Sequence, residues 1–81
     1  MNTTVEISFY PFKETYRDAI QEFVLKVNEF QDLVISTGPT STVTTGEHDH
    51  LFTSLNQMMK WSYATYGKSV FIAKILLDSN P

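Results

Sequence analysis

The middle of the chain, residues 36–49, is the most informative part of the sequence, because it is polar where a pair of strands would be expected to be apolar. Residues 33–35 predict a strand that runs into a Gly38-Pro39 turn, and residues 40–45 predict a second strand after it. Gly46 and the acidic segment that follows are typical of a helix start, with Asp49 as the expected N-cap. The sequence therefore predicts a β-hairpin directly before a helix.

The segment before the hairpin predicts a strand and a helix. Apolar and polar residues alternate along residues 5–10, which indicates a strand that ends at Pro11. Thr15 and Asp18 resemble a capping box, so a helix is expected to follow. Its inward residues at helical spacing are Tyr16, Ile20, Phe23, Val24 and Val27.

The segment after the hairpin predicts a second helix and a last strand. Gly67 stands where a helix C-cap belongs, and residues 70–77 form the strand after it. The expected inward stripe of this helix is Phe52, Leu55, Met59, Tyr63 and Tyr66, with Trp61 at its flank. We expect Tyr16, Phe23, Phe52 and Phe71 to be plain core residues.

The element order is βαββαβ, which packing rules resolve into an α+β, ferredoxin-like sandwich. It has a four-stranded antiparallel sheet with two helices on one face. The first and third strands are central, and the last strand lies beside the first. At 81 residues the chain is expected to be a single domain spanning residues 1–81.

Charge and composition exclude several classes of protein. The net charge is −3, with six scattered Lys and Arg, so no basic stripe is present for nucleic acid. The absence of cysteine excludes disulfides and thiolate chemistry. The chain shows neither a leader pattern nor an apolar run long enough to span a membrane, so we expect a soluble, cytoplasmic protein.

The last strand predicts self-association. Its residues on both faces are apolar apart from Lys74, although two helices can cover only one face of the sheet. We therefore expect a second subunit on the open face, in a homodimer or homotetramer, with Glu6 and Lys74 as charged exceptions.

Four segments in this order resemble the YkoF-type thiamine/hydroxymethylpyrimidine-binding family. They are the opening strand 5–11, the Thr37-Gly38-Pro39 run to Thr42, the Gly46-Glu47-His48-Asp49 helix start, and residues 67–71. The resemblance implies a non-enzymatic protein, without a cofactor, that binds thiamine or its pyrimidine moiety in transport, salvage or sensing. Family proteins carry two such units in tandem or assemble single ones, so this chain would assemble its sites by oligomerisation.

Thiamine needs hydrogen-bond partners for its aminopyrimidine, aromatic contact for its rings, and a carboxylate or π face for its cation. Glu6, Ser8 and Tyr10 share one strand face and supply all three groups. Hydroxyls of the hairpin would lie beside them if Val43 points inward. The predicted ligand-binding residues are Glu6, Ser8, Tyr10, Thr37, Thr42, Thr44 and Lys74. The alternative is that Glu6 only pairs with Lys74 across strands and that the threonines reflect β-propensity.

Catalysis and metal binding find little support. His48 and His50 flank Asp49 at a helix start, where side chains two residues apart diverge, so a solvated helix cap is expected and no metal site. No base is placed near a Ser or Thr nucleophile. The alternative function is a ferredoxin-like regulatory or oligomerisation domain that binds another small metabolite.

Overall fold

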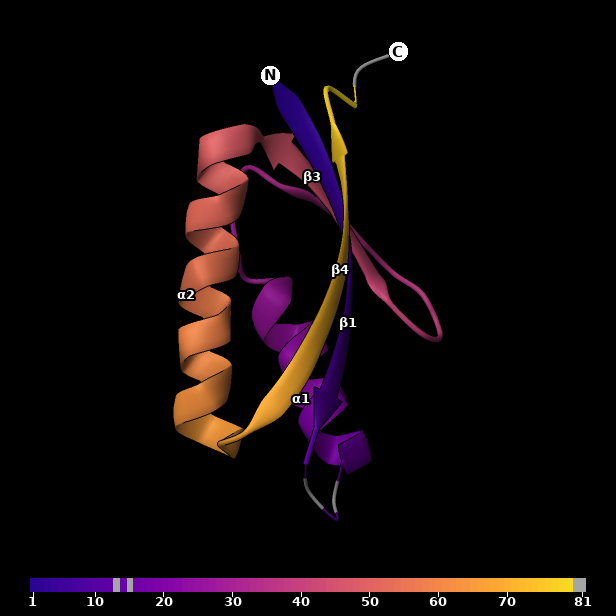
Figure 1. Ribbon diagram of the computed structural model, residues 1–81, viewed down its shortest axis with the longest axis vertical. Helices are drawn as coiled ribbons and strands as arrows, with labels where there is room; N and C mark the ends of the chain where they lie inside the picture. The colour runs from indigo at the N-terminus through magenta and orange to yellow at the C-terminus, as the bar shows by residue number, and fades with distance from the viewer. Residues whose placement is uncertain (13, 15, 80–81) are drawn as a thin grey trace.

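The chain folds into two layers, a four-stranded antiparallel sheet with two helices packed on one of its faces (Figure 1). The computed structural model describes residues 1–12, 14 and 16–79. The elements in chain order are β1 (Asn2–Pro11), α1 (Tyr16–Val27), β2 (Val34–Thr37), β3 (Thr42–Glu47), α2 (His48–Tyr66) and β4 (Ser69–Leu77). The strand order is β2-β3-β1-β4. This is the predicted ferredoxin-like α+β fold, with β1 and β3 central.

The alternation along β1 separates the two faces of the sheet. Val5, Ile7 and Phe9 are buried beneath the helices, while the residues between them point to the open face. Phe9 stacks on Phe23 of α1, with ring centroids 4.7 Å apart, and on Phe71 of β4 at 4.9 Å. This aromatic stack joins β4, β1 and α1 at the C-terminal end of β1.

Helix α1 buries Ala19, Phe23 and Val27, in agreement with its predicted periodicity. Tyr16 is different, because 48% of it is exposed. The prediction that Tyr16 is a core residue is wrong: it is the first residue of α1, before the first buried residue of that helix. The predicted cap at Thr15 lies outside the described residues.

The hairpin differs from its predicted form by two residues. Pairing ends at Thr37 and Thr42, so β3 begins at Thr42 and the loop holds residues 38–41. The Gly38 backbone N–H donates to the Ser41 carbonyl at 2.8 Å and closes this loop. Pro39 has no N–H to donate to a sheet ladder, which favours the longer loop over a two-residue turn.

The two ends of helix α2 correct one expectation and confirm another. Its N-cap is Glu47 and not Asp49, because the Glu47 carboxylate accepts hydrogen bonds from the backbone N–H groups of Asp49 and His50. The C-cap at Gly67 is confirmed, with a positive φ of 77° that suits glycine. The buried stripe is Leu51, Ser54, Leu55, Met58, Ser62 and Tyr66.

The predicted stripe of α2 is therefore wrong at Met59 and Tyr63, which are exposed, whereas Leu55 and Tyr66 are buried as predicted. Two serines of α2, Ser54 and Ser62, are buried in the interior instead. Trp61 is partly buried at the flank, edge-on to Tyr66 and 5.6 Å from the ammonium of Lys26. Its expected place at the edge of the core is confirmed.

Strand β4 pairs with β1 along its whole length, from Pro11 with Ser69 to Thr3 with Leu77. The helices pack mainly over β1 and β3, so most of β4 is exposed in the single chain. Within residues 1–12, 14 and 16–79 no helix is long and apolar enough to cross a membrane.

Candidate functional site: a cleft at the free end of β1

A cleft of about 340 Å³ opens between α1, the end of β1 and the hairpin loop. It exists because β1 is longer than its neighbour: β1 has ten residues, while its pairing with β3 stops where Ile7 meets Thr42. Beyond Ile7, the one strand of the described residues that pairs with β1 is β4, on its other side. The backbone of residues 8–11 therefore presents an unpaired edge toward the cleft.

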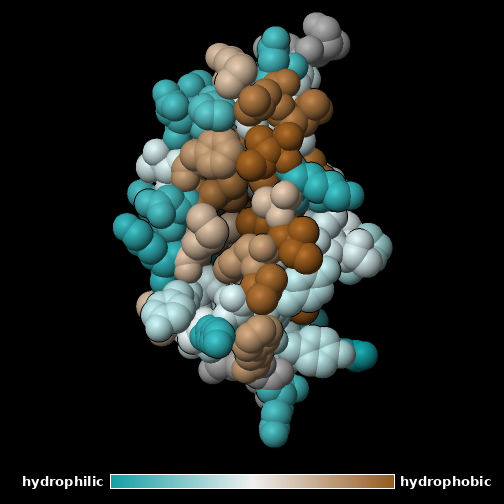
Figure 2. All heavy atoms as spheres, in the orientation of Figure 1, coloured by the Kyte–Doolittle hydropathy of each residue, from teal (hydrophilic) through white to brown (hydrophobic). Residues whose placement is uncertain are grey.

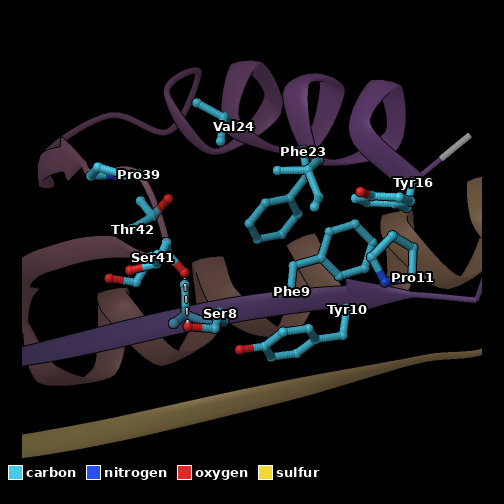
Figure 3. A pocket seen from close by; sticks show the side chains of 14 residues that line it. Ser8, Phe9, Tyr10, Pro11, Tyr16, Phe23, Val24, Pro39, Ser41 and Thr42 are labelled. Carbon is cyan, nitrogen blue, oxygen red and sulfur yellow. Dashed lines mark hydrogen bonds between the residues drawn. The ribbon is translucent and has the colours of Figure 1, made fainter.

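Aromatic rings form the inner part of the cleft. Phe9 and Phe23 lie at its base, and Tyr16 reaches over it from the start of α1 (Figure 3). The stack of Phe9 between Phe23 and Phe71 fixes this base in one orientation. The lining residues are Ile7, Ser8, Phe9, Tyr10, Pro11, Tyr16, Ile20, Phe23, Val24, Gly38, Pro39, Thr40, Ser41 and Thr42.

Neutral polar groups rim the same space. The Ser8 hydroxyl donates to the Thr40 carbonyl at 3.2 Å and ties the free end of β1 to the hairpin loop (Figure 3). Ser41, Thr42 and Tyr16 add further hydroxyls, while the ring of Tyr10 lies on the other side of β1 from Phe9 (Figure 3). No charged side chain is among the described residues that line the cleft. A mostly apolar hollow with a few directed polar groups is typical of small-molecule sites.

The structure brings together three of the predicted site residues, Ser8, Tyr10 and Thr42, which all line the cleft. Thr37 lies beside the cleft, in a shallow hollow with Val24 and Leu25 of α1. The hairpin residues and β1 thus meet as expected, but at the end of the sheet and not across its open face.

Thr42 and Thr44 do not share a face with Glu6, so their predicted placement is wrong. They pair with Ile7 and Val5 and lie beneath the helices, while Val43 faces outward beside Glu6. Thr44 is 1% exposed, and its hydroxyl donates to the Val5 carbonyl at 3.2 Å. This hydrogen bond satisfies a buried hydroxyl and takes Thr44 away from any ligand.

Glu6 and Lys74 face each other across β1 and β4 on the open face. Their charged groups are 3.8 Å apart, as the alternative interpretation of Glu6 predicted, and the Lys74 side chain is largely exposed while that of Glu6 is half-buried. Neither residue lines the cleft. Thr4 and Thr45 are hydrogen-bonded at 2.8 Å on the same face, so the polar groups there are mostly paired with one another.

The histidines lie near the start of β1, at the other end of the strand from the cleft. His48 Nδ1 is hydrogen-bonded to the Thr3 hydroxyl at 2.8 Å, and His50 Nε2 to the Gln31 carbonyl at 2.8 Å. The Glu47 carboxylate accepts hydrogen bonds from the backbone N–H groups of His50 and Asp49, which lower its pKa. The hydrogen bond from His50 has the larger effect. Among the described residues no group of histidines and carboxylates could hold a metal ion.

Tyr16, Phe9 and the loop residues Pro39 and Ser41 were missed as site residues. No local sequence signal marks them, because the free end of β1 depends on where its pairing with the distant β3 stops. Two antiparallel neighbours of unequal length leave one end unpaired. Tyr16 comes five residues after the end of β1, and the start of α1 places it at the cleft.

Comparison with solved structures shows which proteins share this architecture. A candidate thiamine biosynthesis/salvage protein from Thermotoga maritima aligns with a TM-score of 0.82 at 19% identity, covering 93% of this chain and 82% of that one. A protein from Streptococcus pneumoniae aligns at 0.83 and 20% identity, covering 98% and 89%. A domain of unknown function from Bacillus cereus aligns at 0.73 and 18% identity, covering 94% and 75%.

No protein-family model matches the chain, and no curated protein matches it at a significant level. At these identities the structural likeness establishes the fold, since one fold carries many functions. The chain is a four-stranded ferredoxin-like protein whose architecture is similar to that of a candidate thiamine biosynthesis/salvage protein.

Proposed function

We propose that the protein binds the hydroxymethylpyrimidine moiety of thiamine, without converting it, in the cleft at the free end of β1. The observation that carries this proposal is the combination of an aromatic base with an unpaired strand edge in one hollow. A flat heteroaromatic ring needs both: a π surface to lie against and hydrogen-bond partners at its rim.

The chemistry of the lining favours a neutral ring. An aminopyrimidine has an exocyclic amine that donates and ring nitrogens that accept, and the backbone of residues 8–10 offers acceptors and donors in the same plane. Ser41 and Thr42, which carry hydroxyls, also line the cleft. A phosphate or a free thiazolium cation would find no opposite charge among the described lining residues, and burying it there would be costly.

Two further points support this choice. The Thermotoga maritima protein that shares the fold is a candidate thiamine biosynthesis/salvage protein. The alternative, a regulatory domain that binds an amino acid, would need partners for an ammonium and a carboxylate, and neither charge is present among the lining residues that the structure describes. A neutral heteroaromatic ligand therefore fits the cleft better than a zwitterion.

We also propose that the bound ligand is not turned over. The described lining contains hydroxyls but no histidine, carboxylate or amine that could act as a general base, and both histidines lie near the opposite end of β1. Chelator treatment should leave binding and melting temperature unchanged. Loss of binding after chelation would revive His48 and His50 as part of a metal site.

Calorimetric titration with hydroxymethylpyrimidine, thiamine and a panel of amino acids tests the proposal. Tyr16→Ala removes an aromatic ring from the mouth of the cleft and should weaken pyrimidine binding about tenfold, which corresponds to 1.4 kcal/mol. Tyr63→Ala is the matched control, because Tyr63 is an exposed helical tyrosine that does not line the cleft. It should leave the affinity unchanged.

Three results would contradict the proposal. Equal loss of affinity in both tyrosine variants would indicate a general effect on the helices. Binding of an amino acid in preference to the pyrimidine would favour the regulatory alternative. Thiamine binding that is insensitive to Tyr16→Ala would place the ligand elsewhere on the molecule.

A further inference from the structure

Exposed apolar side chains gather along β4 and, on a smaller scale, around Leu25 of α1. Figure 2 shows the column along β4. Its exposed large apolar residues are Val70, Ile72, Ile75, Leu76 and Leu77. These five are not among the described residues that line the cleft. Leu25, in contrast, is 69% exposed and lies in the shallow hollow that borders the cleft. The apolar surface on α1 therefore bears on the ligand.

This hollow has a volume of about 430 Å³. Its lining residues are Ile20, Gln21, Val24, Leu25 and Thr37. Three of the five side chains are aliphatic, and no charged side chain is among the described residues of the lining. The hollow exists because α1 packs mainly on β1 and α2, which leaves the edge strand β2 largely exposed. The surface is thus apolar but open to water.

The hollow is continuous with the cleft, because Ile20 and Val24 line both. These two residues are one helical turn apart, so their side chains form a ridge along α1. Leu25 lies on the next ridge, on the side of the hollow. On the opposite wall, Thr37 of the hollow directly precedes Gly38 of the cleft. One helix and one hairpin therefore wall both spaces.

The hollow adjoins the cleft at the end away from Tyr16. Val24 and Pro39 lie at this end of the cleft, while Tyr16 lies at the other (Figure 3). The aromatic base of Phe9 and Phe23 lies between the two ends. A ring seated on this base therefore has room for a substituent that extends past Val24 into the hollow.

We propose that the hollow binds an uncharged, apolar arm of the ligand whose pyrimidine ring occupies the cleft. This inference rests on the proposed function and extends it, because it names the class of ligand: an aminopyrimidine with an aliphatic group on its hydroxymethyl substituent. That substituent is free to carry the arm, since the amine and the ring nitrogens are used at the strand edge. A charged arm gains nothing beside Ile20, Val24 and Leu25, whose side chains cannot replace its water.

The gain in affinity depends on how much of the arm leaves water. A butyl group has the four carbons of a leucine side chain. The hollow is shallow, so we expect about half of the arm to be buried, which corresponds to about tenfold in affinity. The arm therefore adjusts the affinity, while the ring decides whether the ligand binds.

Calorimetric titration with three probes tests the inference. The probes are hydroxymethylpyrimidine, its butyl ether, and its aminopropyl ether, whose arm has the same length and ends in an ammonium. The butyl ether should bind about tenfold more tightly than hydroxymethylpyrimidine, and the aminopropyl ether should show no such gain. An equal gain with the aminopropyl ether would overturn the apolar character of the subsite.

Leu25→Gln tests whether the arm lies in the hollow. The variant replaces an aliphatic lining side chain with an uncharged polar one, so the gain of the butyl ether over hydroxymethylpyrimidine should fall to less than about twofold. Met59→Gln is the matched control, because Met59 is exposed on α2 and is not among the described residues of either lining. It should keep the full gain. Both positions are exposed, so circular dichroism should show folded variants. An undiminished gain in Leu25→Gln would overturn the inference.

Thr37→Val tests the character of the far wall. Thr37 carries the one hydroxyl among the described residues of the hollow, and valine replaces it with a methyl group on a side chain of similar branching. The gain of the butyl ether should stay the same or increase. Loss of the gain would show that the arm is held by a hydrogen bond, which would overturn an apolar subsite.

The same titrations separate this inference from the proposed function. The inference alone fails if hydroxymethylpyrimidine binds, Tyr16→Ala weakens it, and the butyl ether binds no more tightly. The inference and the proposed function both fail if neither compound binds. A butyl ether that binds about tenfold more tightly, with a gain that Leu25→Gln removes and Met59→Gln keeps, supports both.

Discussion

The two sides of β1 differ in the surface that they leave open. On the side of β3, pairing stops at Ile7, and the free end of β1 joins the hairpin in a small hollow rimmed by hydroxyls. On the side of β4, pairing is complete, but the outer strand presents nine residues with apolar side chains on both faces. The first surface is a small hollow with directed polar groups, and the second is an exposed apolar strand. One strand therefore separates two surfaces of different chemistry.

The largest effect should come from the residue that supports both sides. Phe9 stacks between Phe23 and Phe71, so Phe9→Ala should lower the free energy of unfolding by about 3–5 kcal/mol. Urea denaturation measures this change. Phe12→Ala removes an exposed ring just beyond β1 and should cost less than about 0.5 kcal/mol. Similar losses in both variants would show that the aromatic stack does not anchor the two sides.

The next effect is a loss of stability at high pH, which we expect from the buried phenol of Tyr66 in the core. Burial, together with the Glu22 carboxylate beside its hydroxyl, raises the pKa of Tyr66 to about 12. In the unfolded chain this phenol ionises near pH 10, so its contribution is full below about pH 10 and is lost as the pH rises toward 12. The decline should amount to about 2–3 kcal/mol.

Thermal or urea unfolding across this pH range tests the role of Tyr66. Tyr66→Phe should flatten the decline, because the variant has no phenol to ionise. Tyr63→Phe removes an exposed phenol and should leave the decline in place. An unchanged decline in Tyr66→Phe would assign the alkaline loss to other groups.

The smallest expected effect, that of Glu6→Gln, tests whether the ligand binds in the cleft or on the open face of the sheet. Glu6→Gln should lower stability by less than about 1 kcal/mol, because its ion pair with Lys74 is exposed. With the ligand in the cleft, the same substitution should leave pyrimidine affinity within about twofold, as titration of the folded variant would show. A loss of tenfold or more would move the site to the open face, where the sequence first suggested it.

The order of elements followed from local patterns. Alternation along residues 5–10, helical spacing from residue 16, and the Gly67 cap each reflect contacts within a few residues, and the structure confirms them. The split of β4 into two faces was also correct in its parity, since side chains alternate along any strand. Three residues that line the cleft, Ser8, Tyr10 and Thr42, were also among the predicted site residues.

The errors arose where contacts with a distant segment of the chain decide which side chains are buried. Thr44 looks like a surface residue in the sequence, but a carbonyl on β1 accepts its hydroxyl hydrogen, and this allows its burial. Met59 and Tyr63 look more apolar than Ser54 and Ser62, yet the serines of α2 face inward. Residue type indicates that a helix has an apolar side but does not fix its rotation to within one position.

The sequence by itself determined the elements, their order and the fold class, because hydrophobic periodicity and turn residues act over short distances along the chain. Only the tertiary structure decided where the cleft opens and which surfaces stay uncovered. The cleft depends on the relative lengths and register of two strands far apart in sequence, because β1 extends beyond its pairing with β3. The exposed surface of β4 depends on the placement of the helices, which pack mainly on β1 and β3. Register between distant strands is set by packing of the whole sheet, and no local pattern encodes it.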